Sequence, residues 1–139
     1  MEIIEHIIDI PIEPVACPRP RVSKFGAYYP KKYKDFQKQT KAYLKTLDES
    51  HFQAASKPVH IVYTFIFSRP KYMTAKKYPS GRILHNKRPD LDNLVKAIND
   101  AIQSAGIIDD DSQIYSFGAH KYYAARDEQP GIMLTIQKG

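Results

Sequence analysis

Apolar residues recur along this chain with two different periods, and each period predicts a different kind of secondary structure. Runs of β-branched and aromatic residues predict strands over residues 3–11 and 59–68, the second being the clearest in the chain. Residues 113–123 and 132–137 predict two further strands, which are joined around a Pro-Gly pair and are expected to run antiparallel. We therefore expect a sheet of about four strands.

Two other segments carry apolar residues at spacings of three and four, which gathers them on one face of a helix. Pro30 suits the first turn of the first helix, whose spaced positions are Tyr33, Phe36, Thr40, Tyr43, Leu44 and Leu47. The second helix starts at Asp90 or Leu91, and Gly106 ends it because glycine readily takes the left-handed conformation that follows many helices. Its spaced positions are Leu91, Leu94, Val95, Ile98, Ala101, Ile102 and Ala105.

The remaining segments predict loops and complete the order of elements. Residues 19–29 predict a short hairpin or loop, and the basic, turn-rich residues 69–88 predict a long exposed loop. The order strand, hairpin, helix, strand, helix, strand, strand predicts an α/β (α+β) fold, with a small mixed sheet packed against two main helices. A chain of 139 residues buries one core, so we expect a single domain over residues 1–139.

Composition adds a preferred partner and a cellular location. The formal net charge of +6 favours polyanions such as nucleic acids. Cys17 is the one cysteine, which excludes a disulfide within the chain and a Cys-based zinc site and fits a reducing compartment. The acidic N-terminus is unlike a signal peptide, and the longest apolar run, residues 61–67, is too short to span a membrane. We therefore expect a cytoplasmic protein with no membrane partner.

Charged residues are strongly segregated along the chain. Residues 51–89 contain eight Lys or Arg and no acid, whereas residues 90–111 hold six of the fifteen acidic residues, all of them Asp. A basic stretch by itself is typical of a solvated loop. Here it runs directly into an acidic cluster, and a nuclease needs both features: cations that hold phosphates, and carboxylates that hold a metal ion at the phosphate to be cut.

The acidic cluster contains two groups of candidate metal ligands. Asp90 and Asp92 lie at the start of the second helix, and residues 109–111 are three Asp at the start of the next strand, where they could face the first two. Carboxylates about 4 Å apart repel by about 4 kcal/mol at an effective dielectric constant near 20, and Mg²⁺ or Mn²⁺ would neutralise them. Lys96, on the same helix face as Asp92, could position a water molecule or offset transition-state charge. Two plainer explanations stay open, since Asp at a helix start stabilises the helix dipole and a run of Asp after a Gly can be a simple turn.

A family resemblance favours the metal site over these alternatives. The pattern is Asp-x-Asp-Asn, a Lys on the same helix, then Gly and Asp-Asp-x-Gln, and it is carried by the stretch RPDLDNLVKAINDAIQSAGIIDDDSQIYSFGAHK. This stretch resembles the central motif of the RusA family of Holliday-junction resolvases. An upstream stretch is similar to the N-terminal segment of phage-type members of that family, and it reads PRPRVSKFGAYYPKKYKDFQKQ.

The resemblance implies a RusA-like fold and a complete catalytic set. It matches Asp90, Asp92 and Asp111 to the metal-binding, catalytic carboxylates, and it matches Lys96 to the catalytic Lys. Asp110 is matched to the other Asp of the family pair and joins the candidate metal ligands. The family is dimeric, requires Mg²⁺ or Mn²⁺, and makes paired, symmetric nicks across four-way DNA junctions in recombination and repair. The resemblance therefore implies a homodimer with this activity.

Basic residues on both sides of the acidic cluster are expected to contact the phosphates of branched DNA. The candidates are Arg19, Arg21, Lys24, Lys76, Lys77, Lys87, Arg88 and Lys121. The alternative to an enzyme is a non-catalytic, branched-DNA-binding protein of phage origin that keeps the fold but not the chemistry. The complete set of three Asp and one Lys favours the enzyme, because a binding protein would be free to lose one of them.

Overall fold

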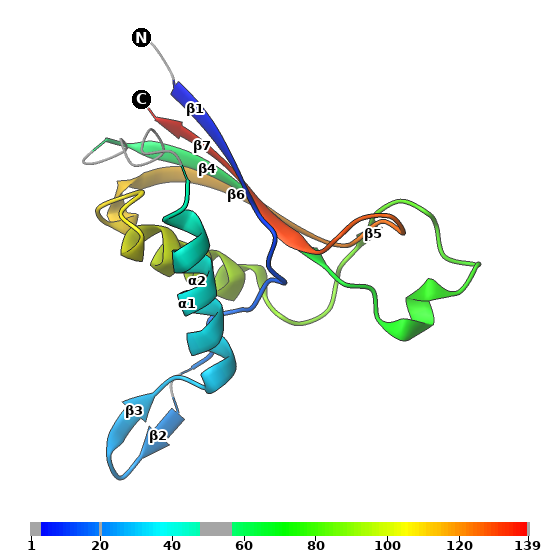
Figure 1. The fold of residues 1–139 in the computed structure, drawn as a ribbon, viewed down its shortest axis with the longest axis horizontal. Coiled ribbons are helices and arrows are strands. Elements are labelled where there is room, and N and C mark those ends of the chain that lie inside the picture. Colours follow the sequence, from blue (N-terminus) through cyan, green and yellow to red (C-terminus); the bar gives the residue numbers. More distant parts are fainter. Residues whose placement is uncertain (1–3, 20, 48–56, 139) are drawn as a thin grey trace.

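The computed structural model describes residues 4–19, 21–47 and 57–138. In this part of the chain two helices cover one face of a five-stranded sheet, and a small hairpin projects away from the body (Figure 1). The sheet contains β1 (Ile4–Ile10), β4 (Val59–Phe67), β5 (Ile83–Leu84), β6 (Ile114–Tyr123) and β7 (Gly131–Lys138). The helices are α1 (Lys31–Leu44) and α2 (Leu91–Ser104), and the hairpin consists of β2 (Arg21–Ser23) and β3 (Gly26–Tyr28).

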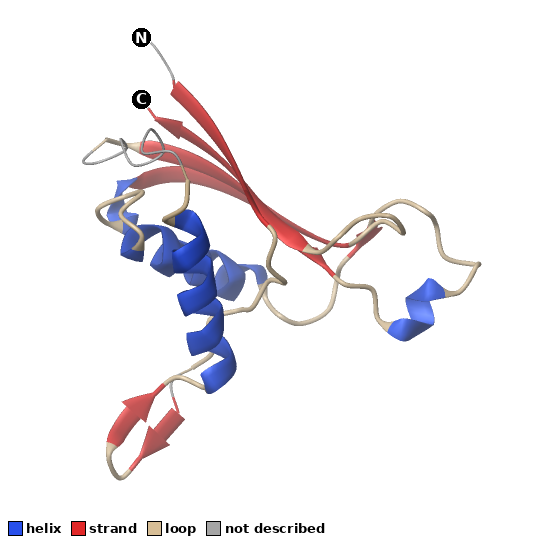
Figure 2. Ribbon diagram, in the orientation of Figure 1, coloured by secondary structure: helices blue, strands red, loops and turns tan. Residues whose placement is uncertain are grey.

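The predicted mixed sheet with two covering helices is confirmed, and its strand order is β1-β7-β4-β6-β5. The four long strands are those expected from the sequence, and the two-residue β5 within the basic segment adds a fifth. β4 pairs in parallel with β6 and antiparallel with β7, so β6 and β7 run in opposite directions as expected (Figure 2). They are not neighbours, because β4 lies between them. The most apolar strand takes this central position since both of its edges are paired there.

The hydrophobic core lies between the sheet and the helices. Val59, Ile61, Tyr63 and Phe65 alternate along β4 and are completely buried beneath the helices. The apolar faces predicted for the two helices pack against this surface and are confirmed. Their buried residues are Tyr33, Phe36, Thr40 and Leu44 on α1, and Leu94, Val95, Ala97, Ile98, Ala101 and Ile102 on α2.

The end of α2 directs the chain into the acidic turn. Gly106 has a φ of 85°, the left-handed conformation expected after this helix. Its N–H donates a hydrogen bond to the carbonyl of Gln103 (3.1 Å), and the N–H of Ile107 donates to the carbonyl of Ile102 (2.9 Å). These two bonds satisfy carbonyl groups that the helix itself leaves open.

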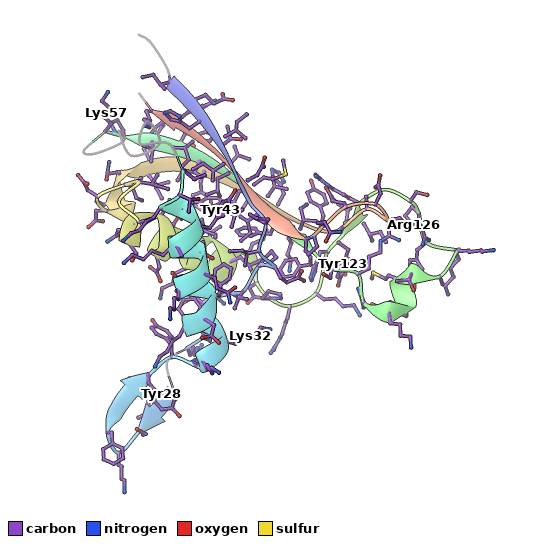
Figure 3. The ribbon with its side chains drawn as sticks, viewed as in Figure 1. Tyr28, Lys32, Tyr43, Lys57, Tyr123 and Arg126 are labelled. Carbon is purple, nitrogen blue, oxygen red and sulfur yellow. The ribbon has the colours of Figure 1, made fainter. Side chains whose placement is uncertain are left out.

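The basic loop predicted over residues 69–88 is an ordered arm. It contains a short 3-10 helix, η2 (Lys71–Thr74), as well as β5. Arg69 donates hydrogen bonds to four backbone carbonyls, three of them in the arm, and Arg126 donates to three more carbonyls of the arm. Arg126 lies beside the arm in Figure 3. The two guanidinium groups therefore hold the arm together, while its lysines are exposed and comprise Lys71, Lys76, Lys77 and Lys87.

The face of the sheet opposite the helices exposes apolar side chains. The Tyr63 side chain points from β4 towards α2, where its hydroxyl contacts Asn99. The strand register puts Ile7, Leu84 and Met133 on the opposite face of the sheet from Tyr63. Ile7 is 62% exposed and Met133 is 39% exposed. Within the described residues, neither α1 nor α2 is long and apolar enough to cross a membrane.

Candidate functional site

The start of α2 presents two open carboxylates. Asp90 occupies the N-cap position expected from the sequence, with extended backbone, but its side chain makes no capping hydrogen bond. Asp92 lies in the first turn, is exposed, and accepts a hydrogen bond from the backbone N–H of Asn93 (2.9 Å). Within the described part of the chain neither carboxylate forms an ion pair. Both therefore keep oxygen atoms available to a ligand.

A line of polar side chains continues from Asp92 along α2. Lys96, Asn99 and Gln103 follow at spacings of four, three and four, which places them in a row on the helix surface. Asn99 accepts a hydrogen bond from the Tyr63 hydroxyl, so this row lies over the middle of β4. Lys96 is exposed and forms no ion pair with Asp92, so its ammonium group is open to solvent one turn after that carboxylate.

The acidic turn after α2 is shaped by Gln113. Its Oε1 accepts hydrogen bonds from the backbone N–H groups of Asp109 (2.6 Å) and Asp110 (3.0 Å). Asp110 Oδ1 in turn accepts from the N–H of Ser112 (2.9 Å). These reciprocal bonds form a capping box around the short 3-10 helix η3 (Asp111–Gln113). The Gln of the Asp-Asp-x-Gln pattern therefore holds the turn in shape.

Asp110 and Asp111 differ in what their carboxyl groups do. Hydrogen bonds from Ser112 lower the pKa of Asp110, whose carboxylate is the cap of η3. The pKa of Asp111 is raised, chiefly because its carboxyl shares a hydrogen bond with Asp110 and also because the charges of Asp110 and Asp100 lie near it. Of these two carboxyl groups, Asp111 is therefore the one whose ionised form a neighbouring cation would stabilise more.

The carboxylates at the two ends of the polar row are not gathered into one cage. Asp92 and Gln103 are eleven positions apart, which is about 16 Å along a helix axis. Asp111 is held at the far end, since its N–H donates a hydrogen bond to Gln103 Oε1 (3.2 Å). Among the described residues no group of three or more His, Cys, Asp or Glu lies close enough together to hold a metal ion. The sequence suggested that residues 109–111 could face Asp90 and Asp92. In the structure this turn instead lies near the end of α2, and its carboxylates form no cluster with those two.

Lys121 on β6 holds the segment that leads into α2. Lys121 is half-buried, and its Nζ donates hydrogen bonds to the carbonyl oxygens of Pro89 (2.6 Å) and Lys87. The sequence suggested that Lys121 contacts phosphates. In this structure its ammonium group instead binds two backbone carbonyls and fixes the chain directly before Asp90.

His85 supports the same segment from within the protein. It is 7% exposed and stacks on Tyr123, with ring centroids 4.1 Å apart. Its Nδ1 accepts a hydrogen bond from the N–H of Lys87 (3.2 Å). Burial, reinforced by the positive charge of Lys121, lowers the pKa of His85. The imidazole is therefore kept neutral, as its acceptor role requires.

Most of the basic residues expected to contact DNA are exposed. They are Arg19, Lys24, Lys76, Lys77, Lys87 and Arg88. Lys87 and Arg88 immediately precede Pro89 and Asp90, so the cations and the open carboxylate are neighbours along the chain. Arg21 lies in β2, but its side chain is outside the described part of the structure.

A cavity of about 480 Å³ joins this region to the base of the projecting hairpin. Its lining includes Pro89, which precedes Asp90, and Pro18 and Pro30, which lie on either side of the hairpin. The N–H of Cys17 donates a hydrogen bond to the carbonyl of Asn93 in the first turn of α2 (2.9 Å). The chain that enters the hairpin is therefore attached directly to the start of α2.

Comparison with known protein families shows which family the chain belongs to. The family model described as Endodeoxyribonuclease RusA matches residues 11–137, nearly the whole chain. The chain belongs to the RusA family. Membership makes it an endodeoxyribonuclease, a hydrolase of a family that acts on branched DNA. No curated protein matches the chain.

The donor chemistry at the start of α2 fits a RusA-family protein that uses a hard divalent cation. Within the described residues the Asp90 side chain makes no capping hydrogen bond and neither Asp90 nor Asp92 forms an ion pair, while Asp92 accepts one hydrogen bond from the N–H of Asn93. Mg²⁺ typically takes only one or two protein carboxylates, with water and substrate phosphate oxygens completing its shell. A cage of three protein carboxylates is therefore not needed for Mg²⁺ to bind here with DNA.

Sequence reasoning missed the side chains that frame the RusA motif. Gln103 could have been found, because it continues the helical spacing of Asp92, Lys96 and Asn99. The Tyr63–Asn99 contact and the Lys121–Pro89 contact could not, since they join residues 36 and 32 positions apart. Such contacts leave no periodic signal in the sequence.

Proposed function

We propose that this RusA-family protein is a divalent-metal-dependent endonuclease that resolves four-way DNA junctions by paired, symmetric nicks in recombination and repair. The observation that carries the proposal is the pair of open carboxylates, Asp90 and Asp92, directly after the exposed cations Lys87 and Arg88. The positive charges of Lys87 and Arg88 attract the oxygens of a phosphodiester to this point. The carboxylates of Asp90 and Asp92 beside them are suited to hold a metal ion.

Asp90 and Asp92 are the side chains that would hold the ion. Asp111 is the further ligand that the family motif suggests, and because the structure holds it at the Gln103 end of α2, we propose that it approaches the ion only when metal and DNA are bound. A bound Mg²⁺ or Mn²⁺ supplies Lewis-acid stabilisation of the charge on the phosphate being cut. Asp110 was also a candidate ligand, and its Oδ1 accepts a hydrogen bond from Ser112 that caps η3 and shapes the acidic turn. We therefore give Asp110 the task of keeping Asp111 in position.

The remaining site residues act on the phosphate and on each other. Lys96 offsets negative charge that develops on the phosphate oxygens in the transition state, since its side chain is exposed one turn from Asp92 and forms no ion pair with any described residue. Lys87 and Arg88 bind neighbouring phosphates. Lys121 and His85 act indirectly, because their hydrogen bonds hold the backbone from which these cations project.

Resolution of a four-way junction requires two nicks, and one chain carries a single Asp90–Asp92 pair. We therefore propose a two-fold symmetric homodimer, the commonest form of oligomer, with one site for each of two related strands. The sheet face that exposes Ile7, Leu84 and Met133 is our candidate for its interface, because apolar side chains gathered on one face favour association. The homodimer would act in the cytoplasm on branched DNA.

The test uses an end-labelled four-way junction and a linear duplex of the same sequence, each with Mg²⁺ or with EDTA. We expect paired nicks in the junction that require Mg²⁺, and little cutting of the duplex. Asp92→Asn protein, purified in the same way, shows whether a contaminating nuclease is at work. Tight junction binding without cutting in Mg²⁺ or Mn²⁺ would contradict the enzyme and support the non-catalytic DNA-binding protein.

A further inference from the structure

The most exposed large apolar side chains in the described part of the protein lie on the projecting hairpin. Phe25 is 88% exposed and Val22 is 85% exposed. Phe25 belongs to the two-residue turn between β2 and β3, at the end of the hairpin that points away from the body (Figure 1). Tyr28, labelled in Figure 3, shows how the hairpin extends beyond the start of α1 near Lys32. An aromatic ring so far from the core contributes nothing to the core.

The hairpin tip is held in a defined shape. The Ser23 hydroxyl donates a hydrogen bond to the carbonyl of Gly26 (3.3 Å) and accepts one from the N–H of Phe25 (3.1 Å). Gly26 has a φ of 111°, which lets the chain turn sharply after the ring. The Nζ of Lys24 lies 5.2 Å from the centre of the Phe25 ring. The tip therefore offers a flat apolar surface and a cation together.

The base of the hairpin is attached to the candidate catalytic helix. Pro18 and Pro30, on either side of the hairpin, line one cavity with Pro89, and Cys17 is hydrogen-bonded to Asn93 in α2. A DNA strand bound at Asp90 therefore lies close to the base of the hairpin. Residues 14–34 contain six Lys or Arg and no acid, so the whole projection attracts phosphates.

We propose that this hairpin is a wedge whose Phe25 ring inserts between bases at the branch point of the DNA, while Lys24 and its neighbouring cations hold the flanking phosphates. This inference rests on the proposed function, because it assumes that the substrate is branched DNA. Bases at a branch point can be unstacked more cheaply than those within a duplex, and any base presents a face on which an aromatic ring can stack. Three residues of extended chain reach about 10 Å, comparable with the depth of about 8.5 Å of the DNA major groove.

Charge and shape together favour nucleic acid over other occupants. A protein partner would bury a contiguous apolar surface, whereas the hairpin offers isolated apolar side chains such as Val22 and Phe25 among cations. An anionic lipid surface also attracts aromatic and basic residues. The experiment therefore includes vesicles as a separate arm.

The chain contains no tryptophan, so Phe25→Trp gives a fluorescent reporter at the hairpin tip alone. This variant is combined with Asp92→Asn and titrated in EDTA with a four-way junction, with linear duplex, and with phosphatidylserine vesicles. We expect the junction to quench the Trp emission strongly through stacking, and the duplex to quench it far less. The matched control is Tyr43→Trp, in the last turn of α1 at the end away from the hairpin, and its emission should stay unchanged.

A second measurement uses junction affinity in EDTA. We expect Phe25→Ala to weaken junction binding by about 5- to 100-fold, the usual cost of losing one stacked base, while duplex binding changes little. Phe25→Tyr should retain most of the affinity, and Val22→Ser serves as the control on the same hairpin. Equal quenching by junction and duplex, unchanged affinity of Phe25→Ala, or a response to vesicles alone would overturn the wedge.

These outcomes are separable from failure of the proposed function. A wild-type protein that nicks junctions while Phe25→Trp gives no quenching would contradict only the wedge. A protein that cuts nothing, but in which junctions selectively quench Phe25→Trp, would keep the wedge as a device for binding branched DNA.

Discussion

The backbone N–H of Asp111 donates a hydrogen bond to the side-chain Oε1 of Gln103, at 3.2 Å. This bond joins the acidic turn to the helix that carries Asp90 and Asp92. It makes Gln103 a positioning residue, because its carbonyl oxygen determines where Asp111 lies along α2.

Gln103→Met removes the acceptor and keeps the length of the side chain. A single hydrogen bond of this kind contributes about 1 kcal/mol, so we expect roughly a fivefold loss of cleavage rate at low Mg²⁺. The loss should shrink as Mg²⁺ is raised, and junction affinity in EDTA should stay the same. Ser104→Ala, the exposed neighbour at the end of α2, is the control. A loss that is independent of Mg²⁺ would contradict a role in positioning a metal ligand.

The carboxylates should separate into two classes when each is replaced by Asn. We expect Asp90→Asn, Asp92→Asn and Asp111→Asn to lower cleavage by more than about 100-fold, because charge that holds the metal ion is lost. Asp110→Asn should keep much of the activity, since an Asn oxygen can still cap η3 through Ser112. In EDTA, all four variants should bind the junction at least as tightly as the wild-type protein does. Wild-type rates in two of the first three variants would rule out this metal site.

Salt dependence measures which cations contact phosphates. Replacing Lys76, Lys77, Lys87 and Arg88 with Ala should weaken binding to all DNA structures and reduce the slope of log K against log salt by about 0.9 for each lost duplex contact. The hydrogen bonds of Lys87 in the structure use its backbone, so these truncations leave them intact.

The control for this measurement removes positive charge elsewhere. Lys38 on α1 and Lys45 at its C-cap are exposed, and the double Ala variant should change the slope little. The change in slope is divided by the number of charges removed in each variant. If this value is the same for the double and the quadruple variant, binding depends on net charge and not on the arm or on the segment before Asp90.

Acid should destabilise the protein through His85. Burial first, and then the charge of Lys121, lowers the pKa of His85 in the folded state from its ordinary value of 6.5. Just below pH 6.5 the unfolded chain therefore binds more protons than the folded chain, and the free energy of unfolding falls as the pH falls. We expect the drop in Tm between pH 7.5 and 5.5 to be smaller in His85→Phe than in wild type. The exposed His120 gives the control, His120→Gln, which should retain the wild-type drop.

The proposed homodimer can be tested with mixed subunits. Heterodimers of wild-type protein and a size-tagged Asp92→Asn variant should nick one strand of a junction only, since each subunit supplies one site. Light scattering at micromolar concentration gives the mass directly. A strictly monomeric protein that still makes paired cuts would refute the dimer.

Single substitutions test the proposed interface. Ile7→Lys and Met133→Lys put charges on the exposed sheet face and should shift the protein towards monomer without unfolding it, because both side chains are exposed. Lys45→Ala, at the C-cap of α1, is the control and should leave the mass unchanged. Dimers that persist in both Lys variants would mean that the interface lies elsewhere.

The sequence by itself determined the helices, the long strands and the chemistry of the motif. Spacings of three and four in α1 and α2, and the apolar run of β4, are local patterns that burial selects directly. Gly106 was also predictable, since its left-handed conformation at the end of α2 is a local requirement. The charge pattern and helix spacing named Asp90, Asp92 and Lys96 as candidate site residues, and the family motif favoured a metal site over the plainer explanations.

Only the tertiary structure decided how these parts meet. β4 separates β6 from β7, because the most apolar strand is buried best in the centre of the sheet. Lys121, expected to contact phosphates, is turned inward by the carbonyl of Pro89 (2.6 Å). Asp111 stays at the Gln103 end of α2 and not beside Asp90. These arrangements depend on hydrogen bonds between segments distant in sequence, and such bonds form only after the core has brought the segments together.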